Sequence, residues 1–212
     1  MEQLTLEAFK AMIKNALIDI KAREDEFSAL DALTGDGDHG TAIVTALSAA
    51  AKAGEQGAEF KSMLNDMGFG VMLETSGSTS TLLGAFFLGM SEHASGKALD
   101  AKGVKAMFAG GLANVQKQTQ AKQGDKTMMD ALIPAVEAMQ ASSSDELAAL
   151  LSAAAEAAVR GAEDTVGMKA NFGRARNYGE RSVGYADSGA MSWSCMFNAF
   201  AQTAKGLDEK LK

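Results

Sequence analysis

Apolar residues recur along most of the chain at intervals of three and four positions, and polar residues occupy the positions between them. This spacing places the apolar residues on one face of an α-helix, so it predicts amphipathic helices. About eight apolar stripes follow one another: Phe9 to Ile20, Ile43 to Leu47, Phe60 to Met72, Leu82 to Met90, Val104 to Val115, Ala131 to Met139, an alanine- and leucine-rich run ending at Val159, and Trp193 to Ala204.

Local signals place two of the helix starts. Thr5 is an N-cap candidate for the first helix, which we expect to extend past the charged run 21–26 because Phe27 and Leu33 continue its apolar stripe. Residues 143–146, Ser-Ser-Asp-Glu, fit a capping box for the seventh helix. Both signals support helical segments joined by short connections.

The predicted fold class is therefore all-α. The stripes have similar widths, so a single closed antiparallel up-and-down bundle or barrel of about eight helices, spanning residues 1–212 as one domain, would bury all of them. In such an array, the connections after the first, third, fifth and seventh helices lie at the same end. They are the aspartate loop (31–40), the Ser/Thr loop (75–81), the turn 123–127 and the arginine loop (167–189).

Composition narrows the class of partner. A net charge of −7 gives no basic surface for a nucleic-acid backbone and disfavours an anionic membrane. The N-terminal residues lack the pattern of a signal peptide, and no long apolar run predicts a membrane span. Cys195 is the only cysteine, so no intrachain disulfide can form, which is compatible with a reducing compartment. We expect a cytoplasmic protein that binds neither nucleic acid nor membrane.

The aspartate loop carries the most specific chemistry. It holds Asp31, Asp36 and Asp38 among three glycines. Carboxylates this close repel one another unless a cation neutralises them, and an all-oxygen ligand set favours Mg²⁺, Mn²⁺ or Ca²⁺. An EF-hand loop fits poorly because Gly40 stands where a further ligand is needed. The alternative is a solvated turn in which Asp38 caps the next helix.

The other loops at the same end suit phosphate. A predicted helix start follows the aspartate loop directly, and small hydroxyl residues precede the fourth helix, so both offer backbone amides to an anion. The arginine loop concentrates Lys169, Arg174, Arg176 and Arg181 among glycines, and guanidinium groups pair well with phosphoryl oxygens. Its alternative is a solvated loop paired with surface carboxylates. Together, these loops predict a magnesium–nucleotide site.

Four motifs in this order resemble the nucleotide-binding L subunit of dihydroxyacetone kinases, and the resemblance spans nearly the whole chain. The motifs are the aspartate segment 30–40, Gly124 to Met128, Gly173 to Ala175, and Gly179 to Gly184 with Asp187 and Gly189. The family fold is an eight-helix antiparallel barrel. The chain differs from the family pattern at 76–81, at Thr119 and at Ser188, which indicates a divergent branch and leaves the ketose unspecified.

The resemblance implies roles for particular residues. Asp31, Asp36 and Asp38 would hold two Mg²⁺ ions, which in turn would hold the phosphates of ADP or ATP. The implied nucleotide contacts come from His39, Gly40, Thr41, Ala42, Ser78, Thr79, Met128, Arg174, Asp187, Ser188 and Gly189.

The resemblance also implies partners. A separate K-type subunit would hold the small-molecule ketose and supply the catalytic base, so no residue of this chain is assigned that role. Two phosphoryl donors stay open: ATP that exchanges freely, or bound ADP rephosphorylated by a phosphoryl-carrier protein of the phosphoenolpyruvate-dependent phosphotransferase system. The absence of further domains favours the second. A homodimer stays open, as does a nucleotide-loaded regulatory subunit that docks on a transcription factor or sensor.

Overall fold

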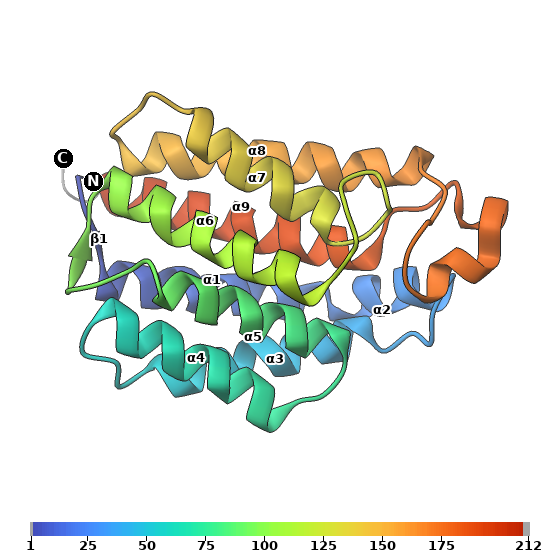
Figure 1. Cartoon of the computed structure of the whole chain (residues 1–212), viewed down its shortest axis with the longest axis horizontal. Coiled ribbons are helices and arrows are strands. Elements are labelled where there is room, and N and C mark those ends of the chain that lie inside the picture. Colours follow the sequence, from blue (N-terminus) through green and yellow to red (C-terminus); the bar gives the residue numbers. More distant parts are fainter. Residues whose placement is uncertain (1, 210–212) are drawn as a thin grey trace.

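The computed structural model describes residues 2–209, which form helices that run up and down beside one another (Figure 1). The helices are α1 (Leu6–Ala22), α2 (Glu24–Ala32), α3 (His39–Gly54), α4 (Phe60–Glu74), α5 (Ser78–Ser91), α6 (Ala101–Gln118), α7 (Met129–Ala141), α8 (Leu147–Asp164) and α9 (Ser188–Glu209). Two 3₁₀ segments, η1 (Thr165–Gly167) and η2 (Arg174–Ser182), lie between α8 and α9. The all-α prediction is confirmed.

The long helices form a closed ring. Starting from α1, each helix packs on the next in the order α1, α3, α4, α5, α6, α7, α8, α9, and α9 packs back on α1. The α6–α7 contact is the lightest in the ring. Helix α2 lies outside this order and extends α1 at one end, where it packs on α3 and α9. The up-and-down order of the predicted bundle is therefore the observed one.

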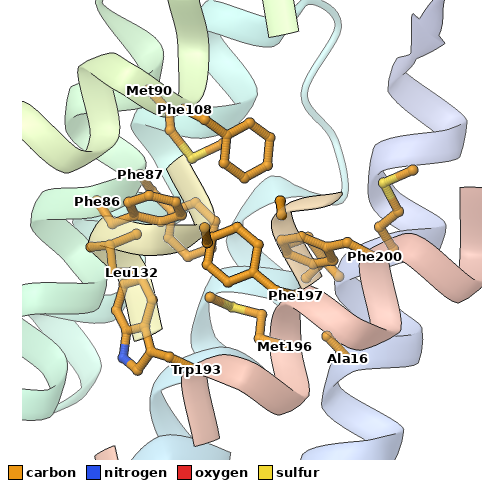
Figure 2. Packing of buried hydrophobic residues seen from close by; sticks show 14 of the residues in the cluster. Ala16, Phe86, Phe87, Met90, Phe108, Leu132, Trp193, Met196, Phe197 and Phe200 are labelled. Carbon is orange, nitrogen blue, oxygen red and sulfur yellow. The ribbon is translucent and has the colours of Figure 1, made fainter. Parts of the chain in front are cut away.

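The core is a single hydrophobic cluster drawn from all the long helices. Figure 2 shows aromatic rings from α5, α6 and α9 meeting in its middle. The rings of Phe86 and Trp193 meet edge to face with centroids 5.1 Å apart, and Phe108 lies 5.9 Å from Phe197. Such pairs add about 0.5–1.5 kcal/mol each beyond the area they bury. This packing holds the ring of helices together without the loops at its ends, so those loops are available for a binding site.

Several predicted boundaries were wrong. The first predicted helix divides at Arg23, which leaves helical geometry (φ −114°, ψ 15°) and pairs with Glu26 at 2.7 Å. After this break Leu33 is 45% exposed, so it does not continue the buried stripe. The capping box at 143–146 does not form, because α8 begins at Leu147 without a side-chain cap. The amide of Glu146 instead donates to Ser144 Oγ in a local turn.

Two further differences concern irregular segments. The arginine loop, expected to lack regular structure, contains η2, and α9 already begins at Ser188. Residues 78–81 of the Ser/Thr loop form the first turn of α5. A two-stranded antiparallel ribbon, β1 (Leu4–Thr5) with β2 (Ala98–Leu99), lies at the end of the bundle away from the arginine loop (Figure 1). In the described range, no helix has both the length and the apolarity that a membrane span requires.

Candidate functional site

The predicted loops gather at the end of the bundle opposite the ribbon (Figure 1). Helices α3, α5, α7 and α9 all begin there, which follows from the alternating direction of the helices. Each N-terminus carries the positive end of a helix dipole, so this end favours anions. The helices α3 and α5 have no side-chain cap, and their first-turn amides are thus open to an external acceptor.

Three carboxylates form a cluster beside these helix starts. One oxygen from each of Asp31, Asp36 and Asp38 lies within 4.8 Å of the others. Asp31 belongs to the last turn of α2, and its carboxylate is held in place by the amide of Gly37, which donates at 2.8 Å. Asp38 occupies the N-cap position of α3, yet its side chain makes no capping hydrogen bond. The helix-capping alternative for Asp38 is therefore wrong.

The charges in this cluster perturb one another. Burial raises the pKa of the Asp38 carboxyl, and the negative charges of Asp36 and Asp31 raise it further. The guanidinium of Arg174 has the opposite effect on Asp36, whose pKa it lowers through a direct ion pair. Arg174 is paired with one of the three carboxylates and so offsets only part of their mutual repulsion. A divalent cation with oxygen ligands would offset the rest, so the residues fit a hard metal ion.

Arg174 reaches this cluster from the arginine loop. It begins η2 directly after Gly173, which has a φ of +64° that favours glycine. Its side chain is 68% exposed on the outer side, so the guanidinium keeps donors free for a further anion. Arg174 therefore lies where a phosphate bridged to the aspartates could also be bound.

His39 joins three elements of the site through a directed chain of hydrogen bonds. Its Nε2 lies 2.8 Å from Ser192 Oγ, which itself donates to the carbonyl of Gly189 at 3.0 Å. Ser192 must then accept from Nε2–H, so Nδ1 accepts from the hydroxyl of Thr79 at 3.3 Å. Burial lowers the pKa of His39, in agreement with this neutral tautomer. The chain fixes the starts of α3, α5 and α9 relative to one another.

The remaining predicted contacts at the start of α3 lie in its first turn. Gly40 is buried there, and a Cβ on it would come within 2.0 Å of the carbonyl oxygen of Glu24. Thr41 turns its hydroxyl to Glu24 Oε1 at 3.0 Å, and the Ala42 amide donates to the Asp38 carbonyl at 2.9 Å. Any contact of Thr41 with a ligand would therefore come from its backbone.

The start of α9 brings the last group of predicted residues to the site. Asp187 caps this helix, since its carboxylate accepts from the amide of Ala190 at 2.7 Å. Ser188 Oγ lies 3.4 Å from Asp31 Oδ1. A Cβ built on Gly189 would lie 3.3 Å from Cβ of Met128, the residue before α7. Ser78, in the first turn of α5, completes the set at this end.

Two buried polar residues beneath the site, Lys126 and Asp130, received no role in the sequence analysis, although Lys126 lies in the motif Gly124 to Met128. The carboxylate of Asp130 accepts from the amides of Gly124 at 2.5 Å and Thr127 at 2.8 Å, which shapes the turn before α7. Lys126 donates to three backbone carbonyls. Asp130 lies in the first turn of α7, where an acidic residue is ordinary, so no pattern in the sequence marked its burial.

Comparisons with known proteins identify the family of this chain. The DAK2 domain family matches residues 33–202. The chain is 32% identical over 187 residues to the ADP-binding subunit DhaL of a PEP-dependent dihydroxyacetone kinase from Listeria innocua, covering 87% of this chain and 89% of that protein. It is also 32% identical to the corresponding Escherichia coli DhaL, with 88% and 92% covered.

A larger relative and solved structures extend the comparison. D-erythrulose kinase of Mycolicibacterium smegmatis is 34% identical, with 90% of this chain but 33% of that protein covered. The crystal structure of the dihydroxyacetone kinase of C. freundii in complex with AMP-PNP and Mg²⁺ matches with a TM-score of 0.70 at 26% identity. The match covers 91% of this chain and 33% of that one, so the chain spans about a third of the solved kinase. This chain belongs to the DAK2-domain family of ADP-binding L subunits of dihydroxyacetone kinases.

Proposed function

We propose that this chain binds Mg²⁺ with ADP or ATP and supplies the phosphoryl group that is transferred to a small ketose on a separate K-type subunit. The observation that carries the proposal is the cluster of Asp31, Asp36 and Asp38, paired with Arg174 beside uncapped helix starts. The complex of the C. freundii kinase with AMP-PNP and Mg²⁺ supports the choice of ligand.

Different residues would bind different parts of the nucleotide. The three aspartates would hold two divalent cations, which when bound would neutralise phosphoryl oxygens and position the transferred group. The open amides of α3 at His39, Gly40 and Thr41, and those of α5 at Ser78 and Thr79, would donate to the phosphates. Ala42, whose amide is bonded to the Asp38 carbonyl, would contact the ligand only through its other atoms. Arg174 would pair with the phosphoryl group from the opposite side.

The remaining contacts would come from the other two helix starts. Met128, Asp187, Ser188 and Gly189 converge between α7 and α9, where Met128 offers an apolar surface and Ser188 a hydroxyl. This position suits the nucleoside part of the ligand. Catalysis by such a site rests on position and charge, since the catalytic base is expected on the partner subunit.

A reconstituted assay tests the proposal. The chain, Mg²⁺, a K-type subunit loaded with dihydroxyacetone or erythrulose, and either ATP or a phosphoenolpyruvate-driven phosphoryl carrier are mixed, and sugar phosphate is measured. We expect sugar phosphate only when this chain and the K-type subunit are both present. ADP binding without any sugar phosphate, across several K-type partners, would instead favour the regulatory subunit.

The donor is tested by dialysis of the purified chain. ADP that survives extended dialysis and is rephosphorylated in place supports a bound coenzyme and a phosphoryl-carrier partner. Rapid loss of ADP supports free exchange with ATP. The two results are distinguished by measuring the nucleotide content of the protein before and after dialysis.

A further inference from the structure

Lys126 is a buried lysine that connects the turn before α7 with both ends of the arginine loop. Only 3% of the surface of this residue is exposed to solvent. The ammonium donates to the carbonyl of Thr165 at 2.6 Å, of Met168 at 3.2 Å and of Tyr185 at 2.6 Å. An ammonium has three donors, so these carbonyls use all of them.

The backbone at Lys126 is also unusual. Its φ is +60°, and it is the only residue other than glycine with a positive φ among residues 2–209. A side chain in this conformation is disfavoured, so a non-glycine residue persists there only where its surroundings hold it. The turn is held on both sides: the Asp130 carboxylate accepts from Gly124 and Thr127, and the Asn171 amide donates to the Asp125 carbonyl at 3.2 Å.

The three acceptors flank the segment that carries Arg174 and end shortly before Asp187. Thr165 and Met168 precede Arg174, and Tyr185 comes two residues before Asp187. Other hydrogen bonds join the same two ends: the Gly184 amide donates to the Val166 carbonyl at 2.9 Å, and the Asp187 amide donates to Thr165 Oγ1 at 2.9 Å. Between these ends, Arg174 begins the 3₁₀ segment η2, in which Ser182 is the only buried residue. The segment therefore has little core of its own to hold it in place.

We propose that Lys126 is a positioning residue for the nucleotide site: its ammonium closes the arginine loop at its base and thereby holds Arg174 and Asp187 over the acidic cluster. The effect on nucleotide binding rests on the proposed function, whereas the closure of the loop does not. The helical bundle has its own core and does not depend on this contact. Removal of the ammonium should therefore open the loop and leave the ring of helices folded.

The first test uses Lys126→Met, with Lys122→Met as the matched control because Lys122 is an exposed lysine directly before the same turn. The arginine loop contains four tryptic sites: Lys169, Arg174, Arg176 and Arg181. Limited trypsin digestion of the nucleotide-free protein should cut this loop at least about tenfold faster in K126M than in wild type or K122M. Affinity for Mg²⁺ and ADP should fall by about ten- to hundredfold, the usual cost of losing a group that orients a site.

A chemical rescue separates the ammonium from the shape of the side chain. In a Cys195→Ala background, Lys126→Cys is alkylated in denaturant with 2-bromoethylamine and refolded. The thiolate displaces bromide and forms a thioether that ends in an ammonium. This derivative should regain trypsin resistance and ADP affinity, whereas the neutral derivative formed with iodoacetamide should not.

The outcomes are decisive. Wild-type trypsin resistance in K126M, collapse of its helical circular dichroism, or equal recovery with the neutral derivative would each overturn the proposal. If wild type itself does not bind ADP, the proposed function fails, but the trypsin comparison still tests the closure of the loop.

Discussion

At the scale of single residues, the site is defined by carboxylates in contrasting environments. Asp36 is paired with Arg174, and the amide of Gly37 orients Asp31. Burial and the neighbouring carboxylates raise the pKa of Asp38. Asp187 differs from these three because its carboxylate caps α9. The carboxylates therefore have different surroundings, although the sequence places three of them within eight positions.

Asp187 gives a prediction about pH. Burial raises its pKa from 3.8 to about 7; the amide of Ala190 and the charge of Lys126 oppose this, and Asp130 and Asp31 add to it. Between these values the folded protein binds a proton that the unfolded chain releases, so the stability of wild type should fall as pH rises from about 4 to 7. Asp187→Asn removes this ionisation. Its free energy of unfolding relative to wild type should rise over that range, at about 1.4 kcal/mol per pKa unit at most.

Urea unfolding of nucleotide-free protein at several pH values measures this difference. Asp145→Asn, at an exposed position in the connection before α8, is the control. A difference between D187N and wild type that stays constant from pH 5 to pH 8 would show that Asp187 is ionised throughout.

At the scale of elements, the sequence predicts those features that depend on residues close together in the chain. Apolar stripes identified the long helices, and the density of aspartates identified the acidic cluster, because both signals lie within a few turns of chain. The break at Arg23 carries neither proline nor glycine, so no local signal marked it. The contacts of Lys126 join residues 39 to 59 positions apart and became visible only in three dimensions.

The junction of α2 and α3 gives a prediction at this scale. A Cβ on Gly40 would lie 2.0 Å from the Glu24 carbonyl oxygen and 2.4 Å from Ser28 Oγ. Gly40→Ala must therefore push the start of α3 away from α2, at a cost of about 1–3 kcal/mol or more in stability. ADP binding should weaken as well, because the open amides move.

The control for this variant is Gly206→Ala, since Gly206 lies in α9 with no atom within 4 Å of an added Cβ. It should leave stability unchanged or raise it by up to about 1 kcal/mol. Thermal unfolding and ADP titration of both variants provide the measurement. Equal stability of G40A and wild type would contradict the close packing of the two helices.

At the scale of the whole molecule, exposed apolar residues lie at the end of the bundle that carries the acidic cluster. Leu33 follows α2, and Leu73 lies in the last turn of α4 with 85% of its surface exposed. Val166 lies in η1, and Val183 follows η2. Such residues at the rim of a polar site suit a protein partner. This is the surface on which we expect the K-type subunit to dock, which would exclude water from the phosphoryl group.

Leu73→Asp tests this surface. If Leu73 is buried when the K-type subunit binds, a charge there should weaken the complex by at least about tenfold. Sugar-phosphate formation at a limiting concentration of the K-type subunit should fall with it. ADP affinity should stay at the wild-type level. Ile18→Asp, at a position on α1 that is 56% exposed, serves as the control. Unchanged affinity of L73D for the partner would place the interface elsewhere.

The central claim is that the three aspartates bind divalent cations that bridge to a diphosphate. Calorimetric titration of ADP into the protein tests it most directly, with wild type in Mg²⁺ or in EDTA, with Asp38→Asn in Mg²⁺, and with Asp25→Asn as a control for an exposed carboxylate on α2. We expect ADP to bind wild type and D25N in Mg²⁺, and binding to be lost in EDTA and in D38N. Equal binding of ADP in Mg²⁺ and EDTA, or wild-type binding by D38N, would contradict the account.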